Sequence, residues 1–176
     1  MPLNEQQKAE AVSAVLAGDT ARFSLLVREH QQKVFALCLS LLQNPSEAEE
    51  AAQAAFVRAF EKLSSFRLQS SFSTWLYRIV YNLCMDRLKE RQRSLPVEDT
   101  MPAPEPSSRE EDVRLLKQAL AKLPREYQAV LMLREGQGLS YEEIAETTGV
   151  TVESVRARLA RARKALQQEA RHFFGT

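Results

Sequence analysis

The sequence has 176 residues, 44% of them hydrophobic, which suffices for one or two small domains with a buried core. These values exclude disorder of the whole chain. The 24 Lys and Arg nearly balance the 23 Asp and Glu, so the net charge of +1 indicates no particular partner. With 5 Gly, 7 Pro and long stretches rich in Ala, Leu, Glu, Gln, Lys and Arg, the composition predicts an all-α fold.

The balanced total hides separated blocks of charge. Residues 67–93 contain six basic and two acidic groups, and residues 154–176 contain six basic groups and one acidic group. Between these blocks, residues 94–112 contain one basic group, six acidic groups and four prolines. Because this segment has few large apolar side chains and its prolines favour extended backbone, we expect a flexible linker there. The linker would join two small helical domains, residues 1–93 and 113–176.

Other classes of protein are disfavoured by what the sequence lacks. Cys38 and Cys84 are too few for a disulfide scaffold and lie on apolar stripes, so we expect buried, reduced thiols. Paired-cysteine metal spacing, a phosphate-binding glycine loop and GxSxG are missing, so we expect no enzyme, metal or cofactor. No apolar run approaches the roughly 20 residues that cross a bilayer, and MPLNEQQKAE does not resemble a signal peptide. We therefore expect a cytoplasmic protein without direct membrane insertion.

The first domain has the three-and-four spacing of amphipathic helices. Asn44 and Pro45 supply an N-cap and a first-turn proline, which mark the start of a helix. The expected helices are, in chain order, a short one before Gly18, a long one along residues 23–41, one along 45–63 and one along 74–93, with a break at 64–73.

Behind the linker, the spacing predicts helices along residues 113–123 and 125–135, which end at Pro124 and Gly136. A helix-turn-helix follows. Its first helix begins with Ser140 and Glu143 in capping-box spacing, Gly149 allows the tight turn, and Thr151 can cap the final helix.

The exposed N-terminal part of the final helix predicts a surface that fits the major groove of duplex DNA. Its residues are Glu153, Ser154, Arg156, Ala157, Arg158, Arg161 and Arg163. Arginines on both sides of the buried stripe would contact phosphates on the two walls of the groove. Glu153 would accept a hydrogen bond from a cytosine amine, and Ala157 would contact a thymine methyl group. An ordinary helical hairpin with a solvated basic face is the alternative.

A second basic surface belongs to the helix along residues 74–93 and the loop before it. It comprises Arg67, Gln69, Arg78, Tyr81, Asn82, Lys89 and Arg93. Cations, amides and an aromatic ring suit unpaired bases and their backbone. We expect the nearby Trp75 to be a core residue, because it lies on the apolar side of the helix.

A third surface, at the start of the helix along 45–63, is acidic. Glu47, Glu49, Glu50 and Gln53 favour the positive end of the helix dipole. They would also form a docking surface for a basic protein helix, and simple solubility is the alternative explanation.

Taken in order, four stretches resemble the extracytoplasmic-function (ECF) class of bacterial RNA polymerase sigma factors. They are PSEAEEAAQAAFVRAFEKL, FSTWLYRIVYNLCMDRLKERQR, LAKLPREYQAVLMLRE and LSYEEIAETTGVTVESVRARLARARKAL. The resemblance implies a region 2 domain and a region 4 domain, joined by a linker, that direct promoter-specific initiation of transcription. An ordinary DNA-binding regulator with a signal-receiving α/β domain, or a helical enzyme, would be the alternatives.

The resemblance also implies roles for the three surfaces. The acidic surface would bind the clamp helices of the largest subunit of core RNA polymerase, and region 4 would hold the flap tip of the β subunit. The surface along 74–93 would recognise and help melt the −10 promoter element, and the final helix would recognise the −35 element. An anti-sigma factor would control the protein. Ala54 stands where an acidic residue is common in this family.

Overall fold

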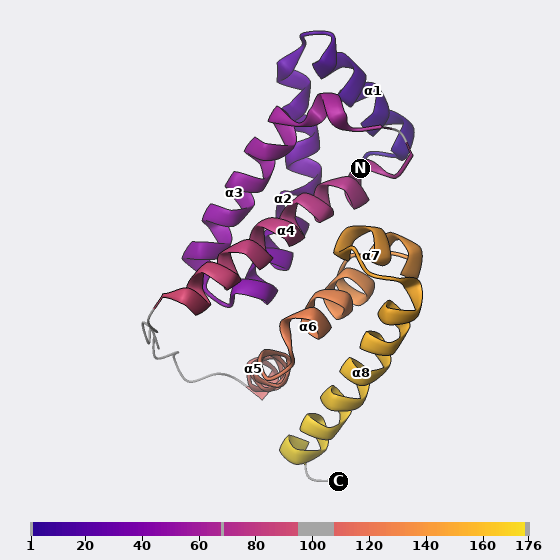
Figure 1. The fold of residues 1–176 in the computed structure, drawn as a ribbon. Coiled ribbons are helices and arrows are strands. Elements are labelled where there is room, and N and C mark those ends of the chain that lie inside the picture. Colours follow the sequence, from indigo (N-terminus) through magenta and orange to yellow (C-terminus); the bar gives the residue numbers. More distant parts are fainter. Residues whose placement is uncertain (1, 68, 95–107, 175–176) are drawn as a thin grey trace.

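The computed structural model describes residues 2–67, 69–94 and 108–174, and within these ranges every regular element is helical. The all-α prediction is therefore confirmed. The elements are α1 (Glu5–Leu16), η1 (Thr20–Arg22), α2 (Phe23–Leu42), α3 (Pro45–Glu61), η2 (Leu63–Ser65), α4 (Phe72–Arg93), α5 (Ser108–Ala121), α6 (Arg125–Leu131), η3 (Met132–Gly136), α7 (Tyr141–Thr148) and α8 (Val152–Phe174). Figure 1 shows α1–α4 gathered into one domain and α5–α8 into another. None of the helices described is long and apolar enough to cross a membrane.

Local capping interactions fix where the helices begin. The Glu47 backbone N–H donates to the Asn44 side chain at 3.0 Å, and Pro45 occupies the first turn of α3. In α7 the capping box is complete: Glu143 N–H donates to Ser140 Oγ at 3.1 Å, and Ser140 N–H donates to Glu143 Oε2 at 2.8 Å. These starts agree with the sequence-based predictions.

Several helix ends differ from the predictions. The helix α4 begins at Phe72, two residues before the expected start, because the Ser71 hydroxyl caps the Thr74 N–H at 3.1 Å. The helix α5 begins at Ser108, so residues 108–112 of the expected linker are helical. The last proline of that segment, Pro106, lies before this start, so no proline interrupts the helix. The rest of the expected linker, residues 95–107, lies outside the described residues.

The core of the N-terminal domain lies between α2, α3 and α4. The contribution of α3 consists of small side chains, namely Ala48, Ala51, Ala52, Ala55 and Ala59. Small residues let neighbouring helices pack closely. Cys38 and Cys84 are fully buried in this core as free thiols, as predicted. Trp75 is half-buried and packs against the core, beside Phe66 and Phe72.

The C-terminal domain contains the predicted helix-turn-helix. Gly149 ends α7 in the left-handed region at φ 72°, and its N–H donates to the Ala145 carbonyl oxygen at 2.9 Å. The Ser154 N–H then donates to the Thr151 hydroxyl at 3.2 Å, which caps α8. On α8, Val155 and Leu159 are buried against the rest of the domain.

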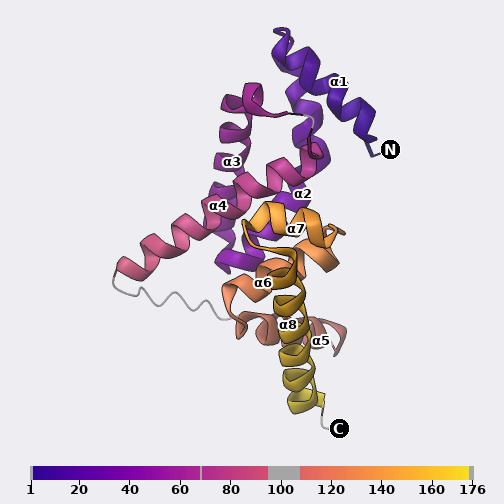
Figure 2. The ribbon, with the colours of Figure 1, turned by 45° about the vertical axis from the view of Figure 1, so that its right-hand side comes forward.

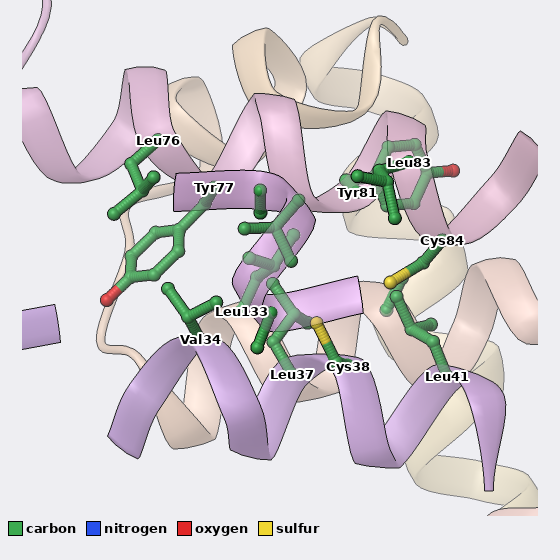
Figure 3. Packing of buried hydrophobic residues seen from close by; sticks show 14 of the residues in the cluster. Val34, Leu37, Cys38, Leu41, Leu76, Tyr77, Tyr81, Leu83, Cys84 and Leu133 are labelled. Carbon is green, nitrogen blue, oxygen red and sulfur yellow. The ribbon is translucent and has the colours of Figure 1, made fainter. Parts of the chain in front are cut away.

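The two domains pack directly against each other, which the sequence did not predict. Helix α7 lies against α4, and α6 lies against α2 (Figure 2). Figure 3 shows Leu133 of η3 among the side chains of Val34 and Leu37 of α2. All three are fully buried. One continuous apolar core therefore spans both domains.

Candidate functional site

The final helix presents most of its predicted DNA-contacting residues to solvent. Glu153, Arg156, Ala157, Arg161 and Arg163 are exposed, whereas Ser154 and Arg158 are half-buried. Two of the exposed arginines are held by neighbours in the same domain, as the next contacts show.

The guanidinium of Arg156 lies 5.9 Å from the centre of the Tyr141 ring, and that of Arg134 lies 5.1 Å from it. Arg163 NH2 lies 2.7 Å from a Glu135 carboxylate oxygen. Both members of this ion pair are about half exposed, so it orients the side chain and contributes little stability. The basic rim is thus partly preformed on the helix-turn-helix domain.

Arg158 points elsewhere. It lies near the phenol of Tyr81 on α4. Burial raises the pKa of Tyr81, and the positive charge of Arg158 opposes this rise. One predicted duplex-contacting residue and one predicted single-strand-contacting residue therefore lie near each other across the boundary between the domains.

Most residues of the second basic surface are exposed on α4, where the exposed Asp86 lies between Asn82 and Lys89. The exposed residues of this surface on α4 and on the loop before it are Arg67, Gln69, Arg78, Asn82, Lys89 and Arg93. Tyr81 is only 7% exposed and lies near Arg158 and Glu126 of the C-terminal domain. The structure therefore brings six of the seven predicted residues to the surface and covers one.

An aromatic cluster supports the loop before α4. The Phe66 ring lies 5.8 Å from that of Phe72 and 5.2 Å from that of Trp75, measured between ring centres. These rings anchor both ends of the segment that carries Arg67 and Gln69. The cluster can hold the loop in place for contact with a nucleic-acid strand.

His30 is a positioning residue that the sequence did not reveal. Its Nδ1 lies 2.9 Å from the Leu26 carbonyl oxygen, which can only accept, so the ring donates there. Its Nε2 lies 3.0 Å from Ser73 Oγ and accepts from that hydroxyl when the ring is neutral. Burial lowers the pKa of His30, which favours this neutral form. The ring thereby ties α2 to the first turn of α4.

The four residues predicted for the acidic surface lie on two sides of α3. Glu47 forms an ion pair with Arg91, and Glu50 forms one with Arg87 at 3.6 Å between Oε2 and NH1. These acids connect α3 to α4. Glu49 and Gln53, the other two predicted docking residues, are exposed on the opposite side, beside α2.

Glu49 and Gln53 border a shallow apolar hollow of about 340 Å³ between α2 and α3. Val27, Phe35 and Phe56 form its apolar lining. The sequence-based prediction named only the polar residues of this surface. Phe35 is 36% exposed although it is large and apolar.

The described part of the chain contains no group of three or more His, Cys, Asp or Glu side chains placed to hold a metal ion. The described residues form two basic helical surfaces and an apolar hollow that has Glu49 and Gln53 on its rim. Such surfaces bind macromolecules.

Comparison with known proteins identifies both domains. Residues 26–94 match the family described as Sigma-70 region 2, and residues 114–166 match Sigma-70, region 4. RNA polymerase sigma-H factor of Pseudomonas aeruginosa is 34% identical over 94% of this chain and 95% of its own length. The ECF RNA polymerase sigma factor SigW of Bacillus subtilis is 31% identical over 95% of this chain and 98% of its own length.

The fold agrees with this relationship. The sigma factor RpoE of Bartonella quintana, solved in complex with the anti-sigma factor NepR, superposes with a TM-score of 0.74 at 26% identity. The match covers 85% of this chain and 96% of that chain, so it includes both domains. Four helices occupy the N-terminal half, where a response regulator would have an α/β domain. The chain therefore belongs to the ECF family of RNA polymerase sigma factors.

Proposed function

We propose that this protein binds core RNA polymerase and directs it to promoters by contacting two DNA elements with two separate helices. The observation that carries the proposal is the presence of exposed basic surfaces on both α4 and α8 in a chain that belongs to the ECF sigma factors. The protein performs no chemistry of its own in this role. Its contribution is the choice of site and the stabilisation of melted DNA.

The helix α8 would recognise the −35 element as duplex. Its N-terminal part combines two short side chains, the half-buried Ser154 and the exposed Ala157, with arginines at the margins. Short side chains allow the helix to lie deep in the major groove, and marginal arginines contact the phosphates. Glu153 would discriminate between bases, because a carboxylate accepts a hydrogen bond from the cytosine amine.

The helix α4 would bind the −10 element after its strands separate. Arg78, Lys89 and Arg93 supply phosphate contacts, and Asn82 supplies an amide for base edges. Arg67 and Gln69 extend this surface into the loop that the aromatic cluster anchors. Each domain alone offers few phosphate contacts, so free protein would bind promoter DNA weakly. Attachment of both domains to the polymerase would add the two contacts through effective concentration.

Core polymerase would dock on two further surfaces. The apolar hollow with Glu49 and Gln53 on its rim suits an amphipathic basic helix, which fits the clamp helices of the largest subunit. Val113 and Leu116 of α5 are half exposed and apolar, and they would contact the β flap tip. We further infer that an anti-sigma factor controls the chain, as the similarity to the RpoE–NepR complex suggests.

Run-off transcription with core polymerase on a library of genomic promoter fragments tests the function. Wild-type protein is expected to start transcription at sites that core polymerase alone does not use. Arg161→Ala on α8 and Asn82→Ala on α4 are expected to reduce that output several-fold. Each variant tests one DNA surface and avoids Arg158 and Tyr81.

Arg22→Ala provides the matched control, because Arg22 is exposed and lies in η1, outside both assigned DNA surfaces. Its output is expected to equal that of the wild type. Loss of the Arg161 guanidinium should also lower the slope of log affinity against log salt by about one. Equal output from all four proteins would contradict both assigned DNA surfaces.

A further inference from the structure

We infer that Lys8 of α1, Ser73 of α4 and His30 of α2 form a directed chain of hydrogen bonds that positions the start of α4 for contact with the unpaired −10 strand. The inference rests on the proposed function of α4. It adds positioning residues that lie outside the predicted DNA surfaces, one of them on α1, a helix to which no role has been given so far.

The hydroxyl of Ser73 lies between two side chains from different helices. Lys8 Nζ lies 3.5 Å from Ser73 Oγ, and His30 Nε2 lies 3.0 Å from the same oxygen. On the other side of the imidazole, His30 Nδ1 lies 2.9 Å from the Leu26 carbonyl oxygen. The chain therefore connects α1 to α2 through the second residue of α4.

The chemistry of the two ends fixes the direction of this chain. A lysine ammonium can only donate, and a backbone carbonyl oxygen can only accept. With a neutral imidazole, one order satisfies every group: Lys8 donates to Ser73, the Ser73 hydroxyl donates to His30 Nε2, and His30 Nδ1–H donates to Leu26. Burial is the largest cause of the lowered pKa of His30, and the charge of Lys8 lowers it further. Both effects favour the neutral ring that the chain requires.

The chain also accounts for a buried lysine. Lys8 is 9% exposed, and lysine is almost never buried without a partner. Its Nζ lies 2.7 Å from a Glu5 carboxylate oxygen, but the Glu5 side chain is 61% exposed, so this ion pair contributes little. Ser73 is the partner that ties the Lys8 ammonium to another helix.

Helix α1 contacts both segments that flank the loop of the second basic surface. It packs against η2, which ends at Ser65, and against α4, which begins at Phe72 (Figures 1 and 2). The link from Lys8 to Ser73 fixes the second of these contacts. The position of α1 is thereby coupled to the end of the loop that carries Arg67 and Gln69.

The His30 ring supports the same loop through aromatic contacts. Its centre lies 5.4 Å from the centre of the Phe72 ring, which in turn lies 5.8 Å from that of Phe66. Rings at these distances and near right angles attract each other. His30 thus holds two consecutive residues of α4, Phe72 by its ring and Ser73 by its Nε2, and Phe72 reaches the residue where the loop begins.

A fixed start of α4 matters for binding of a flexible strand. A loop that already has its binding conformation loses less conformational entropy when the strand binds. Breaking the chain would leave Arg67 and Gln69 in place in the sequence but less well oriented. Strand affinity is therefore expected to fall although no group that contacts DNA is lost, by about fivefold for one hydrogen bond.

The first experiment determines where the protons of His30 lie in the free chain. Long-range ¹⁵N–¹H NMR distinguishes a neutral ring protonated at Nδ1 from the other tautomer and from the charged ring. At neutral pH we expect the neutral ring with its proton on Nδ1, and the spectrum of His30→Leu identifies the signals. A proton on Nε2 alone, or a charged ring, would overturn the chain.

The second experiment measures strand binding by holoenzyme assembled from core polymerase and each variant. The probe is a fluorescein-labelled single strand with the −10 sequence of a start site found by run-off transcription. Ser73→Ala removes the hydroxyl, keeps the charge and suits a helix, and it should bind the strand about fivefold more weakly. Ser73→Thr keeps a hydroxyl and should restore most of the affinity. Glu5→Gln is the matched control, because it removes the ion pair of Lys8 and leaves the chain intact.

His30→Leu separates positioning from direct contact with DNA, because His30 is only 2% exposed. It should weaken strand binding about as much as Ser73→Ala. In the double variant the two losses should not multiply, since both substitutions break the same chain. The affinity for core polymerase should stay at the wild-type value, and circular dichroism would verify the helices at the assay temperature. Losses that multiply, or an equal loss of polymerase affinity, would indicate general destabilisation and overturn the inference.

Failure of this inference and failure of the proposed function give different results. If wild-type protein directs initiation while Ser73→Ala binds the strand as tightly as wild type, the positioning role is refuted and the function stands. If wild-type protein does not direct core polymerase to any start site, the promoter role is refuted and the positioning role with it. The NMR spectrum decides the hydrogen-bond chain in either case.

Discussion

Replacement of Gly149 by alanine should destabilise the protein by a predictable amount. The residue adopts φ 72° and ψ 26° where α7 ends, and its N–H bonds to Ala145. A Cβ atom added there would meet no other atom within 4 Å. Steric collision is therefore excluded, and the cost is that of the left-handed conformation alone, about 1–2 kcal/mol for a residue with a Cβ. For a chain of this size, 1 kcal/mol corresponds to a loss of about 2–4 °C in Tm.

Urea denaturation followed by circular dichroism measures this cost. The urea concentration at the unfolding midpoint should be lower for Gly149→Ala than for the wild type. The slope of the unfolding free energy against urea concentration should stay constant, because the surface area exposed on unfolding does not change. Gly149→Asn should lose less, since asparagine tolerates the left-handed region better than alanine. Gly138 has the same φ of 72°, and a Cβ atom there would also meet nothing within 4 Å. Gly138→Ala is therefore the matched control and should lose a similar amount of stability. The reasoning would be refuted if Gly149→Ala were as stable as the wild type, or if Gly149→Asn lost more stability than Gly149→Ala.

Three further predictions follow from buried or capping side chains. Cys38 and Cys84 are fully buried, and their hydrogen bond and burial raise the pKa of the Cys84 thiol. Ellman's reagent should therefore label neither thiol until urea unfolds the protein. Rapid labelling of the folded chain would contradict this prediction. Burial lowers the pKa of His30 below 6.5, so the free energy of unfolding should be full above pH 6.5 and decrease as the pH falls toward the folded pKa. This decrease should weaken in His30→Gln, as measured by urea titrations across that range, and an unchanged decrease in that variant would contradict the role of His30. Asn44→Ala should lose about 1 kcal/mol, because the Glu47 N–H loses its acceptor, whereas Asn44→Asp should retain most of the stability.

The sequence predicted those features that depend on residues close together in the chain. Asn44 caps a residue three positions later, and Ser140 and Glu143 cap each other across the same spacing. The turn at Gly149 depends on one backbone conformation that glycine adopts readily. One error is local as well. The helix expected along residues 125–135 is α-helical only to Leu131 and continues as a π turn, which apolar periodicity does not distinguish.

The predicted surfaces were partly changed by packing. The sequence placed Tyr81 with the exposed residues of α4, because a tyrosine beside a basic face looks available to a base. The structure buries it under another domain. The acidic residues of α3 were treated as one surface, yet Glu47 and Glu50 pair with arginines of α4 while Glu49 borders the apolar hollow.

By itself, the sequence determined the helices, the buried thiols, the two basic faces and the family of the chain. Each of these follows from side-chain spacing along one helix or from an ordered set of motifs. Only the tertiary structure decided how the domains cover each other. Its decisive contacts join residues far apart in the chain, such as Thr74 with Glu143 across 69 positions and Tyr77 with Gln137 across 60. No periodicity or local motif encodes such pairs, because they arise when separate helices bury their surfaces against one another.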